Sequence, residues 1–134
     1  MPSAATLETF IAAVERGAHV QAIRDFYADD ASMRENQAPP RRGLLALVAH
    51  EEAVMARTRH VESHCVRPVF VNGDHVVIRW IFLFTGTDGQ TRRMEELAWQ
   101  RWEGERIAQE EFFYDPAQLQ SALALPGDAA AHRE

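Results

Sequence analysis

The segment 95–114 constrains the fold more than any other part of the chain, because polar and apolar residues alternate along it on both sides of a glycine. Such alternation is typical of β-strands, and Gly104 interrupts it. Glycine adopts the positive φ angle that two-residue turns require, so we expect two antiparallel strands joined by a hairpin. The strands carry the adjacent acids Glu95-Glu96 and Glu110-Glu111. Because side chains alternate across a sheet, each face receives a carboxylate from each pair.

Helical spacing dominates the first part of the chain. Apolar residues recur three and four apart from Leu7 to Val14, and Gly17 follows as a terminator. A second helix is expected up to Asp29-Asp30, whose side chains favour a turn. The segment 31–36 predicts one short strand before a proline-rich loop, and a third helix follows from residue 44 to about residue 57.

Two further alternating segments predict strands at residues 61–72 and 75–85, and the first strand of the hairpin extends over residues 92–102. Pro68 indicates an edge strand or a bulge, since proline cannot donate to a strand ladder. Segment 75–85 is apolar on both sides, so we expect both its faces to be covered. Helices precede strands, which indicates the α+β class, with a four-stranded antiparallel meander over residues 60–114.

Composition limits the classes of function. A chain of 134 residues with 46% hydrophobic residues fits one domain, expected over residues 1–124 with a flexible tail at 125–134. The net charge of −6 argues against nucleic acid as a partner, and no apolar run is long enough to span a membrane. The single Cys65 and the absence of a leader-like N-terminus predict a cytoplasmic protein. No metal-ligand spacing or cofactor motif is found, so we expect chemistry without a metal or cofactor.

Three motifs together resemble those of the nuclear transport factor two-like superfamily, more closely its SnoaL-like and ketosteroid isomerase-like branch. They are residues 25–32 (DFYADDAS), Arg42-Gly43, and residues 102–107 (WEGERI). The similarity covers roughly residues 6–116. It implies a cone-shaped fold in which N-terminal helices and a curved, mainly antiparallel sheet enclose an apolar pocket, usually in a homodimer. Members include isomerases, dehydratases, polyketide cyclases and non-catalytic binding domains.

The resemblance also implies positions for catalytic groups. An acidic general base is expected shortly after the Asp-Asp-Ala element, where Glu35 stands. The phenol and carboxylic acid that stabilise an oxyanion in ketosteroid isomerases fall near Ile11 and Ala98, whose side chains donate no hydrogen bond. Dehydratases use a histidine from the strand after the third helix, the region of His60 and His64.

Each candidate has a structural alternative. Glu35 acts as a base if it faces an apolar cavity, or is a solvated rim residue paired with a neighbouring arginine. His60 and His64 suit proton transfer, or are surface groups. Glu96 and Glu111 share a face if the hairpin turn has two residues. On a pocket face they bind a ligand hydroxyl or amine, and on the outer face they pair across a dimer with Arg79, Arg92, Arg93 or Arg101. The candidate pocket residues are Val14, Met55, Trp80, Glu96, Gln100, Trp102, Glu111 and Phe113.

Two functions remain open from the sequence. The first is a cofactor-free isomerase, cyclase or dehydratase acting on a small apolar carbonyl compound, with Glu35 as base and His60 or His64 as acid. The second is a non-catalytic domain that binds a small hydrophobic ligand. In either case we expect a homodimer through the convex sheet face, where Leu97 and Trp99 are the expected outer residues.

Overall fold

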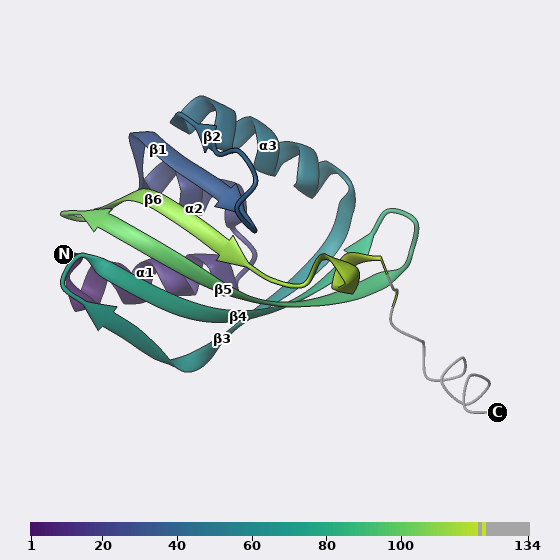
Figure 1. The fold of residues 1–134 in the computed structure, drawn as a ribbon. Coiled ribbons are helices and arrows are strands. Elements are labelled where there is room, and N and C mark those ends of the chain that lie inside the picture. The colour runs from purple at the N-terminus through teal and green to yellow at the C-terminus, as the bar shows by residue number, and fades with distance from the viewer. Residues whose placement is uncertain (121, 123–134) are drawn as a thin grey trace.

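The computed structural model describes residues 1–120 and 122, which form three α-helices and one six-stranded sheet (Figure 1). The helices are α1 (Ala4–Glu15), α2 (His19–Phe26) and α3 (Leu44–Ala56). The strands are β1 (Tyr27–Glu35), β2 (Arg41–Arg42), β3 (Thr58–Asn72), β4 (His75–Gly86), β5 (Thr91–Glu103) and β6 (Arg106–Phe113), and a short 3₁₀ helix η1 follows at Pro116–Leu119. The predicted flexible tail at 125–134 lies outside the described residues.

Local signals in the sequence explain where α1 begins and ends. The Ser3 hydroxyl accepts a hydrogen bond from the Thr6 amide at 3.1 Å and so caps the first turn. Gly17, with a φ angle of 83°, follows the last turn in the left-handed region that glycine tolerates best. The apolar stripe from Leu7 to Val14 is buried against the sheet, as predicted.

The sheet has the order β2-β1-β6-β5-β4-β3. Strands β3 to β6 form the predicted antiparallel meander, whereas β1 pairs with β6 in parallel. In Figure 1 the sheet curves in front of α1 and α2, and α3 lies along its β1 edge. This arrangement confirms the α+β class, with helices covering one face of a curved sheet.

The prediction for β1 was wrong in extent. A turn was expected at Asp29-Asp30 and a strand only over residues 31–36, but the strand begins at Tyr27 and runs through both aspartates. Its pairing with β6 shifts register between Tyr27 and Ser32, and the two aspartates remain exposed there. The two aspartates therefore lie in the irregular part of β1, between residues on both sides that pair with β6, and this long-range pairing is not contained in local propensity.

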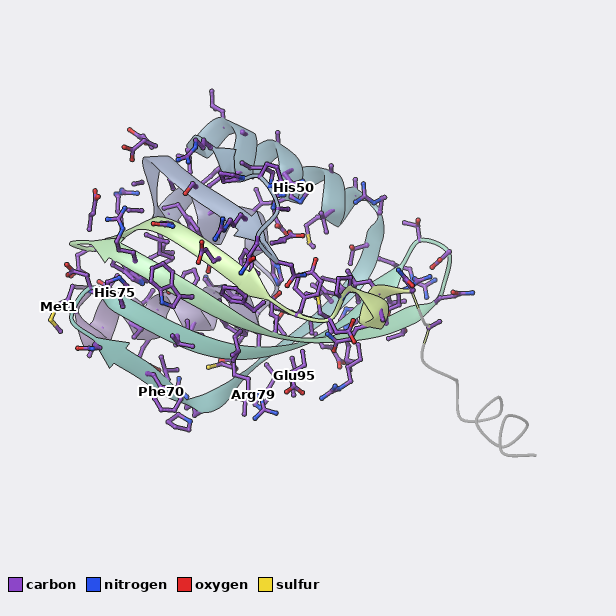
Figure 2. The ribbon with its side chains drawn as sticks, viewed as in Figure 1. Met1, His50, Phe70, His75, Arg79 and Glu95 are labelled. Atoms are coloured by element: carbon purple, nitrogen blue, oxygen red, sulfur yellow. The ribbon has the colours of Figure 1, made fainter. Side chains whose placement is uncertain are left out.

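The two faces of β4 differ as the alternation predicts. Val76, Ile78 and Trp80 are buried beneath the helices, whereas Val77, Ile81 and Leu83 lie on the outer face and are partly exposed. Figure 2 shows the side chains of Phe70, Arg79 and Glu95 pointing away from α3, on which His50 lies. The edge strand β3 shifts register between Val66 and Phe70, around Pro68, as expected of a proline in a strand.

None of the helices in the described part of the chain has the length and apolar character needed to cross a bilayer.

Candidate functional site

A cavity of about 710 Å³ lies between the inner face of the sheet and the helices. Its size and largely apolar wall are typical of a small-molecule site. The wall consists mainly of aromatic and aliphatic side chains from α1, α2, α3 and four strands: Phe10, Val14, Ile23, Met33, Val54, Trp80, Phe82, Phe84, Met94 and Phe112. A small, mainly apolar molecule is therefore the kind of ligand that the cavity suits.

Four glutamates from four different elements face this cavity, and Asp88, between β4 and β5, is a fifth carboxylate of the wall. Glu35 comes from β1, Glu51 from α3, Glu96 from β5 and Glu110 from β6. Two phenols, Tyr27 and Tyr114, lie among them. Acidic side chains in an apolar cavity lose hydration, so their protonation states become sensitive to their neighbours.

Glu110 lies at the centre of a buried hydrogen-bond network. The Tyr27 hydroxyl donates a short hydrogen bond to one carboxylate oxygen, and the Gln100 amide donates to the other at 2.7 Å. The Trp102 indole in turn donates to the Gln100 carbonyl at 2.9 Å. Both carboxylate oxygens of Glu110 thus have partners, and the Gln100 side chain is fixed in one orientation.

Burial raises the pKa of Glu110 to about 7, although its hydrogen bonds from Gln100 and Tyr27 act in the opposite direction. The same burial, together with the charge of Glu110, raises the pKa of Tyr27 well above its usual value. Near neutral pH Glu110 therefore gains and loses a proton readily, while the Tyr27 phenol stays protonated. A group that titrates near the working pH is suited to proton transfer.

Glu96 differs from Glu110 because no hydrogen bond from the described residues reaches its carboxylate. Its side chain is 6% exposed and lines the cavity. Burial raises its pKa well above the usual value, and the charges of Glu110, Glu35 and Glu51 act in the same direction. The unbound cavity therefore favours a neutral Glu96.

Glu35 lies at the rim of the cavity, between an arginine and a phenol. Arg41 donates to one of its oxygens at 3.1 Å, and the Tyr114 hydroxyl donates to the other at 2.9 Å. Burial, followed by this hydrogen bond, raises the pKa of Tyr114 to about 12. The Glu35 side chain is 37% exposed. Glu35 lines the cavity, in agreement with the prediction from strand alternation. It also pairs with an arginine at the rim, which was the alternative prediction.

His19 is another polar residue of the wall. Its Nε2 atom lies 2.9 Å from the Ser63 hydroxyl oxygen, and its Nδ1 atom lies 3.7 Å from a Glu51 oxygen. His50 on α3 also lines the cavity. These histidines, and not the ones singled out from the sequence, are the imidazoles next to the enclosed space.

His60 and His64 lie on the edge strand β3 and are exposed, and neither lines the cavity. Their nearest acids are Glu62 at 3.7 Å from His60 and Glu15 at 3.8 Å from His64. The structure therefore does not bring either histidine together with Glu35. Their catalytic role stays a prediction to which the geometry adds no support.

The hairpin contains a bulge that changes which acid faces the cavity. The two-residue turn forms as expected: Glu103 pairs with Arg106, and residues 104 and 105 lie between them. The register then shifts, so that Trp102 pairs with Ile107 but Arg101 pairs with Gln109, and Ala108 has no partner. This extra residue reverses the faces of the rest of β6.

The predicted placement of Glu111 and Phe113 in the pocket is therefore wrong. Glu111 lies on the outer face, where its carboxylate is 2.7 Å from the Arg34 guanidinium, and Phe113 is 40% exposed. Glu110, on the opposite side of β6, occupies the inward position instead. Glu111 therefore forms an ion pair on the outer face, but its partner is Arg34 of the same chain and not an arginine across a dimer.

The other predicted pocket residues divide into two groups. Val14, Trp80 and Glu96 line the cavity, as predicted. Gln100 and Trp102 are buried but do not line the cavity, and Gln100 donates a hydrogen bond to Glu110, which does. Met55 on α3 is not part of the wall. Tyr27, Glu51 and Tyr114 were missed, although Tyr27 stands in the motif that carries the family resemblance.

Within the part of the chain that the structure describes, no three histidine, cysteine, aspartate or glutamate side chains are arranged to hold a metal ion.

Comparison with known proteins agrees with this architecture. The sequence profile of the SnoaL-like domain matches residues 7–110. A search of curated proteins gave no match. A solved structure described as a SnoaL-like polyketide cyclase from Mesorhizobium loti is 21% identical, with a TM-score of 0.70; the alignment covers 83% of this chain and 97% of that one.

Two further solved structures share the fold. An LEH-like epoxide hydrolase from M. tuberculosis is 13% identical, with a TM-score of 0.70 and coverage of 86% of this chain and 84% of that one. A hypothetical protein with a ketosteroid isomerase-like fold from Catenulispora acidiphila is 17% identical, with a TM-score of 0.72 and coverage of 87% and 89%. At these identities the likeness shows the fold alone. By its sequence profile and its architecture, the chain belongs to the SnoaL-like domain family of the nuclear transport factor two-like superfamily.

Proposed function

We propose that the protein is a cofactor-free general acid–base enzyme that acts on a small, largely apolar carbonyl compound. The observation that carries this proposal is the Tyr27–Glu110 pair in the wall of an apolar cavity that also holds Glu35 at its rim. A phenol backed by a carboxyl group that titrates near neutral pH is a hydrogen-bond donor suited to a developing oxyanion.

The reaction in the proposal is proton abstraction next to a carbonyl group. The Glu35 carboxylate takes a proton from the α-carbon, and the electron pair of the broken C–H bond moves onto the carbonyl oxygen to give an enolate. When Glu110 is protonated, its O–H donates to the Tyr27 oxygen, which reverses the hydrogen bond between the two side chains, and the Tyr27 O–H then donates to the enolate oxygen. Return of a proton to the same carbon or to another position completes exchange or isomerisation. Tyr27 takes the role of acid here, because His60 and His64 lie outside the cavity wall.

Proton exchange tests the proposal before any natural substrate is known. The bicyclic ketone 2-tetralone is incubated in D₂O with the protein, and loss of its α-proton signals is followed by NMR. We expect the wild-type protein to accelerate exchange and Glu35→Gln to lower that rate by roughly 10²-fold. The matched control is Glu52→Gln, which changes an exposed acid on α3. No acceleration by the wild-type protein, or equal rates in both variants, would contradict the proposal.

A second candidate is a non-catalytic domain that binds a small hydrophobic ligand. It is supported by the contacts of Glu35, whose two oxygens already accept hydrogen bonds from Arg41 and Tyr114. For this function we expect 2-tetralone to shift the amide resonances of cavity residues without exchange of its protons. Glu35→Gln then changes ligand affinity only slightly.

A further inference from the structure

Glu96 is the cavity carboxylate that has no polar partner among the described residues. Glu35 and Glu110 accept hydrogen bonds, Glu51 lies 3.7 Å from His19, and Asp88 lies 3.6 Å from Arg92. The Glu96 side chain is more than nine-tenths buried, it faces the enclosed space, and no described residue donates a hydrogen bond to it. An acid in such a position is costly to keep ionised unless something in the cavity carries the opposite charge.

The charged groups around Glu96 do not supply that opposite charge. Glu110 faces it from β6, Glu35 from β1 and Glu51 from α3, and all three act against its ionisation. Among the arginines of the cavity wall, Arg41 is paired with Glu35 at 3.1 Å and Arg92 lies 3.6 Å from Asp88.

The other groups that face the cavity do not neutralise Glu96 either. Arg57, at the end of α3, is exposed to solvent. His19 contacts Glu51 and Ser63 and not Glu96. His50 lies on α3, next to Glu51 in the sequence. The interior of the cavity therefore has an excess of acidic groups over cationic ones.

The wall next to Glu96 is aromatic. Trp80 pairs with Glu96 across β4 and β5, and its ring stacks on Phe82 with centroids 5.6 Å apart. Phe82 in turn packs against Phe84 at 5.5 Å. Aromatic faces attract cations through their quadrupoles, and they also bury apolar groups. A carboxylate beside an aromatic row suits a cation that carries apolar substituents.

We propose that the ligand of this cavity carries a protonated amine, whose nitrogen donates a hydrogen bond to Glu96 while its apolar substituents lie on the row Trp80, Phe82 and Phe84. The inference rests on the proposed function, because it takes the same cavity to be the ligand site. Binding ionises Glu96, so the carboxyl proton is released to solvent as the ammonium ion takes its place.

A matched pair of small probes tests the role of the charge. N,N-dimethylbenzylamine is protonated at neutral pH, and isobutylbenzene has the same shape without the charge. We expect calorimetry and amide shifts to show that the amine binds at least about tenfold more tightly, since its charged hydrogen bond is made in a desolvated site. Titration in phosphate and in HEPES buffer at the same pH measures the protons released, expected to reach up to about one per site.

Two variants separate the site from general electrostatics. Glu96→Gln should lower amine affinity at least about tenfold, remove the proton release and leave isobutylbenzene binding unchanged. The neighbouring acid Glu95 lies on the outer face, paired with Arg79 at 2.6 Å, so Glu95→Gln should leave both probes unaffected. Thermal unfolding checks that both variants fold, and proton release by the wild-type protein provides a test without any variant.

The outcomes for this inference and for the proposed enzyme are distinct. Equal affinity for the two probes, no proton release, or an unchanged preference in Glu96→Gln would overturn the amine inference. If 2-tetralone shows no accelerated exchange while the amine binds through Glu96, the enzymatic proposal fails and the amine site stands. If exchange is accelerated and the amine preference is absent, only the amine inference fails.

Discussion

At the scale of single residues, Glu110 links the chemistry of the cavity to the stability of the fold. Burial raises its pKa from 4.5 to about 7. Between these values the folded protein keeps a proton that the unfolded chain has lost. The unfolding free energy therefore falls as pH rises from about 4.5 through 7 and then levels off. Because one pKa unit corresponds to roughly 1.4 kcal/mol, the change is on the order of 3 kcal/mol.

Replacing Glu110 tests this dependence. We expect the wild-type protein to be more stable towards urea at pH 5 than at pH 8. In Glu110→Gln that difference should shrink, because glutamine cannot ionise. The raised pKa of Glu96 acts in the same direction, so part of the pH dependence remains in the variant. Glu103→Gln, at an exposed acid of the hairpin, serves as control. A wild-type stability that rises from pH 5 to pH 8 would contradict the assignment.

The phenol next to Glu110 permits a second prediction at the same scale. The hydrogen bond from Tyr27 lowers the pKa of Glu110, because it stabilises the ionised carboxylate. Tyr27→Phe removes this bond and should raise the pKa of Glu110 further. Carboxyl ¹³C chemical shifts followed from pH 4 to pH 9 measure the change. A lower pKa in the variant would show that the hydroxyl does not donate to Glu110 in solution.

At the scale of elements, β6 shows why the site was only partly predictable. The alternation in segment 95–114 correctly predicts two strands joined by a tight turn, but it leaves open which face Glu96 lies on. It does not predict the bulge at Ala108, because a bulge depends on how two strands pair and has no distinct pattern in the local sequence. One unpaired residue therefore exchanged the positions expected for Glu110 and Glu111. The same limit applies to β1, whose extent depends on its partner β6.

Removal of the bulge residue is the corresponding prediction. Deleting Ala108 makes the pairings of Trp102 with Ile107 and of Arg101 with Gln109 consecutive, so Glu110 should stay inward and keep its contacts with Tyr27 and Gln100. We therefore expect the deletion variant to unfold cooperatively and to keep the raised pKa of Glu110, which carboxyl ¹³C chemical shifts measure. Ala108→Gly keeps the number of residues and should cost only about 1 kcal/mol. A deletion variant in which Glu110 has its ordinary pKa would mean that the pairing of β6 with β5 does not determine the face of Glu110.

At the scale of the whole molecule, the order of helices and strands was predictable because apolar residues recur every three or four positions in a helix and every second position in a strand. The cavity was implied by the family resemblance, but its contents were not. Tyr114 and Arg41 meet at Glu35 because β1 lies between β2 and β6 in the sheet. The contact between Glu35 and Tyr114, which are 79 residues apart in the sequence, depends on the pairing of β1 with β6. The outer face is different, since the alternation of β4 and β5 alone places its apolar residues there.

We propose that this outer face forms a homodimer. Phe70 and Leu97 are 63% and 46% exposed there, and Phe113 on β6 pairs with Leu97 across the strands. An apolar surface of this kind on neighbouring strands is typical of an interface. Leu97→Asp should therefore shift the protein from two chains to one in sedimentation at micromolar concentration, because a carboxylate would be buried without a partner. Leu45→Asp changes a leucine that is 88% exposed on α3 and should leave the dimer intact. A wild-type protein that sediments as a single chain would leave this apolar face open to another partner and would contradict the dimer.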